Sequence, residues 1–215
     1  ILANRYFHNG PFLDSYFFSY QEDESETFGI GDTVRDPEIN NSIASKFIKK
    51  RVEQNPFDQH TGFGHSLGGF WILKMAMEHP DAFNNLVFIN LPIRGMPRNP
   101  IRWAQTQALK EVLKPFGLDP AKVTDYLFNL WDDPDYQKKI KKFVSDFTKS
   151  GRKIIIVYTK GDIIVPEESA VVEGAEVLPV SAGNVNPFNP LEVFAAHGMA
   201  VEDEKVLTLS SKRVG

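Results

Sequence analysis

The sequence predicts an α/β fold with a mostly parallel central sheet flanked by helices, and three observations lead to that prediction. Two short apolar runs, residues 86–89 and 154–158, show no polar alternation, which is typical of strands buried on both faces of a parallel sheet. Stretches with helical periodicity lie before and between these runs. The 215 residues, 42% of them hydrophobic, can bury one substantial core, so we expect a single domain over residues 1–215.

The N-terminal part begins with two runs rich in aromatic and β-branched residues within 1–20, separated by a turn-forming segment at 8–11. This pattern predicts two strands around a loop. The acidic residues 21–26 are predicted to be a solvated loop, because neighbouring carboxylates repel one another. Asp36 and Pro37 then form a helix start. The apolar positions of that helix follow at helical spacing: Ile39, Ile43, Phe47 and Val52.

The central part contains a helix predicted over residues 66–79, which is apolar on more than one face, as in a helix lodged between a sheet and other elements. Residues 92–147 then carry three helix starts of one design, a capping side chain followed by proline: Asn99-Pro100, Asp119-Pro120 and Asp133-Pro134. This stretch is too long for one crossover helix. We therefore expect a helical insertion, part of which forms a cap over the top of the sheet.

Composition excludes several classes of function. Lys and Arg number 24 against 28 Asp and Glu, and a net charge of -4 argues against nucleic acid as a partner. The sequence has no cysteine, which excludes disulfides, thiolate catalysis and Cys-ligated zinc and leaves cytosol and exterior both open. No run approaches the roughly 18 apolar residues of a transmembrane segment. The chain begins at Ile1, which is compatible with removal of a leader or an upstream strand.

The motif Gly64-His65-Ser66-Leu67-Gly68-Gly69 fits the pattern G-x-S-x-G, in which a strand turns sharply into a helix and holds a serine at the corner. Glycines are needed there because strand and helix must pass closely for the hydroxyl to protrude. The alternative is a tight turn in which Ser66 only caps the helix. Since the apolar helix follows at once, Ser66 is predicted to be a nucleophile.

A nucleophilic serine needs a base, and the base needs an orienting acid. Asp162 follows the strand predicted at 154–158 and is the expected acid, with an ordinary turn aspartate as the alternative. His197 is the only histidine after Asp162 and is the expected base, in a loop that follows a strand predicted at residues 176–180. A surface loop histidine is its alternative.

The developing oxyanion needs two backbone N–H donors. We expect the first from Leu67, at the start of the helix. The second is expected from the early loop at residues 8–12, where Pro11 has no N–H. Phe12 is the first choice and Gly10 the second, while an ordinary turn is the alternative.

These residues resemble the α/β-hydrolase superfamily, and within it the bacterial triacylglycerol lipases and carboxylesterases with a G-H-S-x-G-G motif. Residues 157–165 are similar to the acid-bearing segment of the small Bacillus-type lipases, and residues 196–199 to their histidine loop. The resemblance implies a Ser66–His197–Asp162 triad and no metal or organic cofactor. Two departures are a polar approach to the motif at residues 57–63 and an insertion longer than in minimal lipases.

The resulting hypothesis is a serine hydrolase that cleaves carboxylic esters through an acyl-enzyme, with a small-molecule or lipid-like ester as substrate. Two alternatives remain. The same triad could serve thioester or amide hydrolysis or acyl transfer, because the pocket walls decide the reaction. A non-catalytic binding protein could also keep this fold. Oligomeric state and natural substrate do not follow from the sequence.

Overall fold

The computed structural model of the chain describes residues 49, 60–100, 103, 107, 120–186 and 189–202, and all structural statements below concern these residues. Predictions for residues 1–48 and 50–59, including two strands and most of one helix, lie outside this part of the chain.

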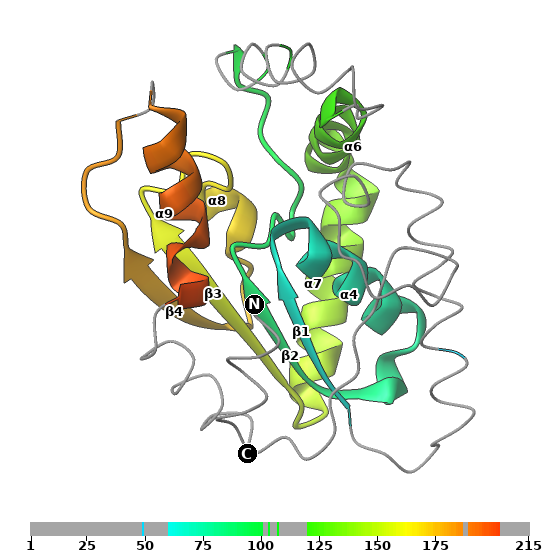
Figure 1. Ribbon diagram of the computed structural model, residues 1–215. Helices are drawn as coiled ribbons and strands as arrows, with labels where there is room; N and C mark the ends of the chain where they lie inside the picture. The colour runs from blue at the N-terminus through cyan, green and yellow to red at the C-terminus, as the bar shows by residue number, and fades with distance from the viewer. Residues whose placement is uncertain are drawn as a thin grey trace.

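A parallel sheet of four strands forms the centre of the described structure, in the order β1-β2-β3-β4 (Figure 1). Every neighbouring pair is parallel, and in the pairing of β2 with β3, Val87 lies opposite Ile155. The strands are β1 (His60–His65), β2 (Phe83–Ile89), β3 (Lys153–Lys160) and β4 (Glu176–Ser181). The parallel sheet and the strands predicted around residues 86–89, 154–158 and 176–180 are therefore confirmed.

Helices connect and cover these strands. They are α4 (Ser66–Glu78), the short 3-10 helix η1 (Pro80–Ala82), α6 (Pro120–Asp132), α7 (Pro134–Lys149), α8 (Glu167–Ala170) and α9 (Pro190–Glu202). Within the described residues, none of these helices combines the length and apolar character needed to cross a membrane.

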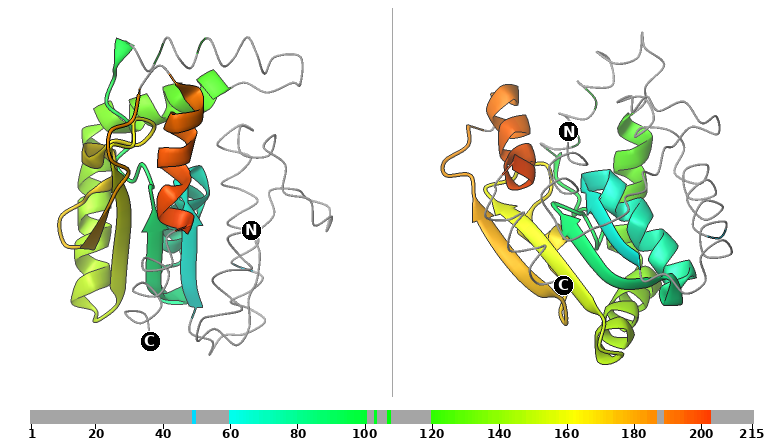
Figure 2. Two further views of the ribbon diagram at one scale, coloured as in Figure 1. Left: turned by 60° about the vertical axis from the view of Figure 1, so that its left-hand side comes forward. Right: turned by 60° about the horizontal axis from the view of Figure 1, so that its bottom comes forward.

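The sheet has two buried faces, because successive side chains of a strand point to opposite sides. Leu86 and Ile156 belong to a large apolar cluster shared with α4, α6 and α7. Val87 and Ile155 belong to a second cluster, to which α9 contributes Ala200. Figure 2 shows α7 and α9 on opposite sides of the sheet. The arrangement is a three-layer α/β/α fold, as the continuous apolar runs predicted.

Helix α7 illustrates how the predicted Asx-Pro starts work. The Asp133 side chain accepts hydrogen bonds from the backbone N–H groups of Asp135 (2.9 Å) and Tyr136 (3.2 Å), and Pro134 occupies the first turn. These bonds satisfy donors that a helix leaves free at its N-terminus. The helix buries Ile140 and packs against β3. This part of the 92–147 stretch therefore covers a face of the sheet.

Candidate active site

Ser66 lies at the corner between β1 and α4. Its φ is +51°, one of two positive values among non-glycine residues of the described chain. A left-handed conformation is unfavourable for a residue with a Cβ, and such strain gathers at functional sites. The corner is the strand-to-helix turn that the glycine-serine motif predicted, and Ser66 is partly exposed in it.

The glycines of the motif permit a very close crossing of strand and helix. A Cβ on Gly64 would lie 2.2 Å from the Cα of Gly69, and a Cβ on Gly69 would lie 3.0 Å from the carbonyl oxygen of Gly64. Both neighbours are backbone atoms, which cannot move aside as a flexible side chain could. The requirement for glycine at these positions is therefore geometric.

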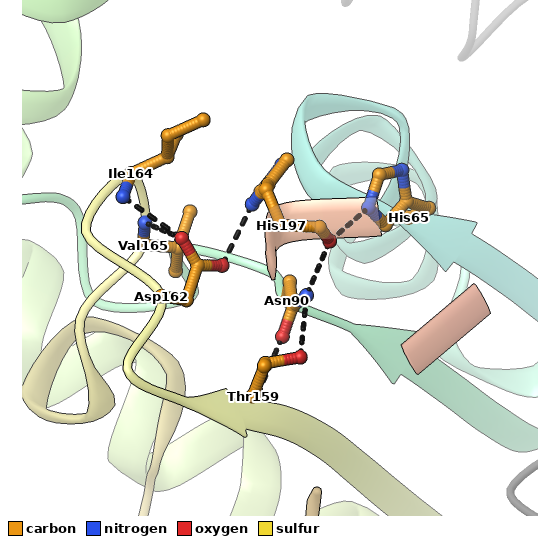
Figure 3. A network of polar contacts seen from close by, with 7 residues as sticks. All are labelled: His65, Asn90, Thr159, Asp162, Ile164, Val165 and His197. Carbon is orange, nitrogen blue, oxygen red and sulfur yellow. Dashed lines mark hydrogen bonds and ion pairs between the residues drawn. The ribbon is translucent and has the colours of Figure 1, made fainter. Parts of the chain in front are cut away.

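Asp162 lies in the turn that follows β3, where Gly161 takes a φ of +90°. The side chain of Asp162 is fully buried. Its Oδ1 accepts hydrogen bonds from the backbone N–H groups of Ile164 (2.8 Å) and Val165 (3.1 Å). These two bonds fix the carboxylate and leave Oδ2 to face His197 (Figure 3).

His197 is buried, with 8% of its surface exposed, and its Nδ1 lies 2.7 Å from Oδ2 of Asp162. The expected loop position is wrong, because His197 lies inside α9. Gly198 was compatible with a loop, but one glycine costs a helix only about 1 kcal/mol. Burial of Ala196 and Ala200 from the same helix compensates that cost.

The Asp162–His197 contact sets the chemistry of the imidazole. A carboxylate accepts only, so the hydrogen bond places the proton of a neutral imidazole on Nδ1. Nε2 then carries a lone pair that can take a proton. Among the described residues no hydrogen bond joins the Ser66 hydroxyl to this ring, but the ring of His65, the residue before Ser66, lies 4.9 Å from the His197 ring centroid.

A buried asparagine in the site was not predicted. Asn90 follows β2, is fully buried, and has a φ of +47°. Its Nδ2 donates to the backbone oxygen of His197 (2.6 Å) and to Oγ1 of Thr159 (3.1 Å), and its Oδ1 accepts from the N–H of Thr159 (2.8 Å). Its position directly after a buried parallel strand was the available signal, because functional side chains gather at the carboxyl ends of such strands.

His65 is the second residue whose part in the site the sequence did not indicate. The pKa of His65 is lowered to about 4, chiefly by burial and next by the neighbouring His197, while the hydrogen bond to the His197 backbone and the charge of Asp162 act in the opposite direction. The imidazole of His65 is therefore neutral near pH 7. In that state it adds no positive charge beside His197.

Of the two expected oxyanion donors, Leu67 lies in the first turn of α4, where backbone N–H groups have no partner within the helix. Phe12 and Gly10, the choices for the second donor, lie outside the described residues.

No protein-family model and no curated protein matches the chain, whereas solved structures do. A carboxylesterase of the ammonia-oxidising thaumarchaeon Nitrososphaera gargenis is 13% identical with a TM-score of 0.50, over 81% of this chain and 72% of that chain. A thermophilic esterase from Thermogutta terrifontis is 11% identical with a TM-score of 0.49, over 81% and 71%. A bromoperoxidase from Bacillus anthracis is 14% identical with a TM-score of 0.47, over 82% and 75%.

Identities this low bear on the fold alone. The parallel sheet with helices on both faces and the sharp turn from β1 into α4 agree with that likeness. The chain therefore has the fold of the α/β-hydrolase superfamily.

Proposed function

We propose that the chain is a serine hydrolase that cleaves carboxylic esters, with Ser66 as nucleophile, His197 as base and Asp162 as the orienting acid. The observation that carries the proposal is the buried contact of 2.7 Å between Asp162 and His197, reached across 35 positions of sequence. Burial of an aspartate and a histidine is costly unless their polar atoms are hydrogen-bonded, and here the two side chains bond each other. Their contact beside the strained turn of Ser66 supports the proposal, and acyl transfer requires in addition that Nε2 of His197 reach the Ser66 hydroxyl.

The first half of the reaction forms an acyl-enzyme. The Oγ of Ser66 attacks the ester carbonyl carbon while its proton passes to Nε2 of His197. Asp162 stabilises the resulting imidazolium through the bond at Nδ1, where its oxygen already lies in place. The tetrahedral intermediate collapses as the alkoxide leaves with the proton from Nε2.

The second half reverses these roles. Water attacks the acyl carbon, and its proton passes to Nε2 of His197. Collapse of the second intermediate returns the proton to Ser66 and releases the acid. Both intermediates carry an oxyanion, for which the N–H of Leu67 at the start of α4 is the proposed first donor, with Phe12, or Gly10 in its place, as the second.

We prefer ester hydrolysis because one structural neighbour is described as a carboxylesterase. Thioester hydrolysis, amide hydrolysis and acyl transfer use the same three side chains. These alternatives differ from ester hydrolysis in the pocket walls and in the acceptor that replaces water.

The proposal is tested with p-nitrophenyl esters of increasing acyl length, assayed beside acyl-CoA and aminoacyl substrates, with Ser66→Ala as the blank. We expect Ser66-dependent release of p-nitrophenol and a preference for one range of acyl lengths. Faster turnover of acyl-CoA or of an amide would show that thioester or amide hydrolysis, and not ester hydrolysis, is the preferred reaction. Absence of Ser66-dependent turnover on every substrate would favour a non-catalytic binding protein.

A further inference from the structure

The backbone carbonyl of His197 receives side-chain contacts from two other elements. Nδ2 of Asn90, at the end of β2, lies 2.6 Å from this oxygen, and Nε2 of His65, at the end of β1, lies 3.2 Å from it. Figure 3 shows both side chains pointing at the same oxygen from different strands. A carbonyl oxygen has two lone pairs and can accept bonds beyond those of a helix ladder.

The orientation of the Asn90 amide is determined by its other partners. Its oxygen faces the N–H of Thr159 at 2.8 Å, which can only donate, so the nitrogen must face the carbonyl of His197. The backbone N–H of Asn90 donates to Val157 at 2.8 Å. Asn90 is therefore bonded to β3 through both its backbone and its side chain, which makes it a rigid support.

The His65 contact joins the same carbonyl to the serine turn. Since a carbonyl only accepts, the bond requires the proton of His65 to lie on Nε2. His65 directly precedes Ser66 in the chain. The bond from its side chain therefore connects the backbone of the base to the residue next to the nucleophile. Burial lowers the pKa of His65 to about 4, which keeps this side chain neutral when His197 becomes protonated.

We propose that Asn90 and His65 are positioning residues that hold the main chain of His197, and with it the imidazole, at a fixed place relative to Ser66. The inference rests on the proposed function in taking His197 as the base. Among the described residues, the hydrogen bond to the His197 ring is the one that Asp162 makes at Nδ1, and a ring held at one atom can still shift with its helix. A second attachment at the backbone carbonyl removes that freedom, and displacement of a reacting group by about 1 Å can cost 10²-fold in rate.

Thr159 offers a matched control within the same network. Thr159→Val removes the hydroxyl that Asn90 contacts at 3.1 Å and leaves the bond to His197 in place. Asn90→Gly removes the side chain and keeps the left-handed backbone, since glycine tolerates the φ of +47°. Both variants lose buried hydrogen bonds. Only Asn90→Gly removes the bond to the carbonyl oxygen of His197.

The kinetic test measures kcat and KM per active site, with sites counted by titration with a fluorophosphonate. We expect Asn90→Gly to lower kcat by about 10- to 100-fold with little change in KM. His65→Phe should lower kcat by a smaller factor, because the bond it removes is longer. Thr159→Val should stay within about threefold of the wild type, with a lowered melting temperature. Equal kcat per titrated site in Asn90→Gly and the wild type would overturn the proposal.

A spectroscopic test is independent of turnover. In a Ser66→Ala background, the Nδ1 proton of His197 is followed by NMR, with His197→Ala identifying the signal. We expect faster exchange with solvent in Asn90→Gly than in Thr159→Val. Identical exchange in the two variants would refute the positioning role. If the parent protein shows no Ser66-dependent turnover, the proposed function fails, whereas the NMR comparison still reports on the carbonyl contacts.

Discussion

Two buried regions of the molecule differ in what they require of their side chains. One is the polar edge of the sheet, formed by Asp162, His197 and Asn90, and the other is the apolar cluster beneath α7. At the edge, Asp162, His197 and Asn90 each have specific partners at hydrogen-bond distance. In the cluster, residues such as Ile140 and Phe147 need only be apolar and of suitable volume. Within the described part of the chain, the buried Nε1 of Trp71 even lacks a hydrogen-bond partner.

Different substitutions should therefore affect the stability of the fold and the rate of the reaction. Loss of apolar volume in the cluster lowers the free energy of unfolding and should leave each folded active site intact. Loss of one polar partner at the edge should alter the rate at each site more than the stability.

Ser66→Ala should abolish ester cleavage without unfolding the protein, because alanine keeps the backbone corner and removes the attacking oxygen. We expect a fall in kcat of about 10⁴-fold or more, with His197→Ala costing nearly as much since the residues act as a unit. Steady-state kinetics and thermal unfolding of both variants provide the check. A near-normal rate in His197→Ala would mean that another residue is the base.

Gly64→Ala should disrupt the close crossing of β1 and α4 at the serine turn. The new Cβ would lie 2.2 Å from the Cα of Gly69, so strand and helix must separate. We expect a loss of more than about 4 kcal/mol in the free energy of unfolding, measured by urea denaturation.

The control is Gly151→Ala, where φ is +84° but a Cβ would meet no atom of the described residues within 4 Å. The strain of that backbone alone should cost about 1–2 kcal/mol. Similar losses in the two variants would contradict the close-crossing account.

Ile140→Ala should destabilise the protein while leaving the site unchanged. Ile140 is 1% exposed in the cluster between α7 and the sheet. Truncation of such a side chain costs about 2–5 kcal/mol, against about 0.5–1.5 kcal/mol for Ile140→Val. Urea denaturation gives the loss, and kcat per titrated site should match the wild type. A tenfold fall in that rate would show that the cluster and the polar edge are coupled.

Acid should weaken the fold through His65. Its pKa is about 4 in the folded chain against 6.5 for the free side chain, so the unfolded state binds the extra proton between these values. The free energy of unfolding should therefore fall as pH decreases from about 6.5 to about 4, by roughly 3 kcal/mol at most. His65→Gln, which does not titrate, should show a shallower slope in urea denaturation over that range. An unchanged slope would assign the acid sensitivity to other groups.

Asp133→Ala should have the smallest effect. It removes the side chain that caps α7 through the N–H groups of Asp135 and Tyr136. The expected loss is about 1 kcal/mol. A lower melting temperature with an unaltered kcat would show that the start of α7 contributes to stability alone. A reduced kcat would show that it also affects the site.

The sequence predicted the parallel sheet and its main helices. A strand that is buried on both faces has apolar residues at successive positions, and such continuous runs are visible in the sequence. It also predicted the capped start of α7 and the strand-to-helix corner, which depend on local residue types. The short β1 was harder to anticipate, since residues 57–63 are polar for a buried strand. Pairing with β2, a tertiary contact, stabilises β1.

Chain order predicted which acid and which histidine lie together, whereas side-chain contacts between distant residues could not be predicted. Asp162 and His197 meet as that order implied. The part that Asn90 and His65 play follows from contacts across 107 and 132 positions, which no local pattern reports. The helical setting of His197 was missed because the histidine was expected in a loop after a late strand, as in the family that the chain resembles. The cap expected within residues 92–147 stays a prediction, as do the catalytic roles of the predicted triad and the oxyanion roles of Leu67, Phe12 and Gly10.

The most direct test of the account is mass spectrometry of the protein after reaction with a fluorophosphonate. We expect one covalent adduct per chain, on the peptide that contains Ser66, lost in Ser66→Ala and formed much more slowly in His197→Ala. An adduct on a different residue, or no adduct when a known serine hydrolase is labelled in parallel, would contradict the assignment of Ser66 as the nucleophile.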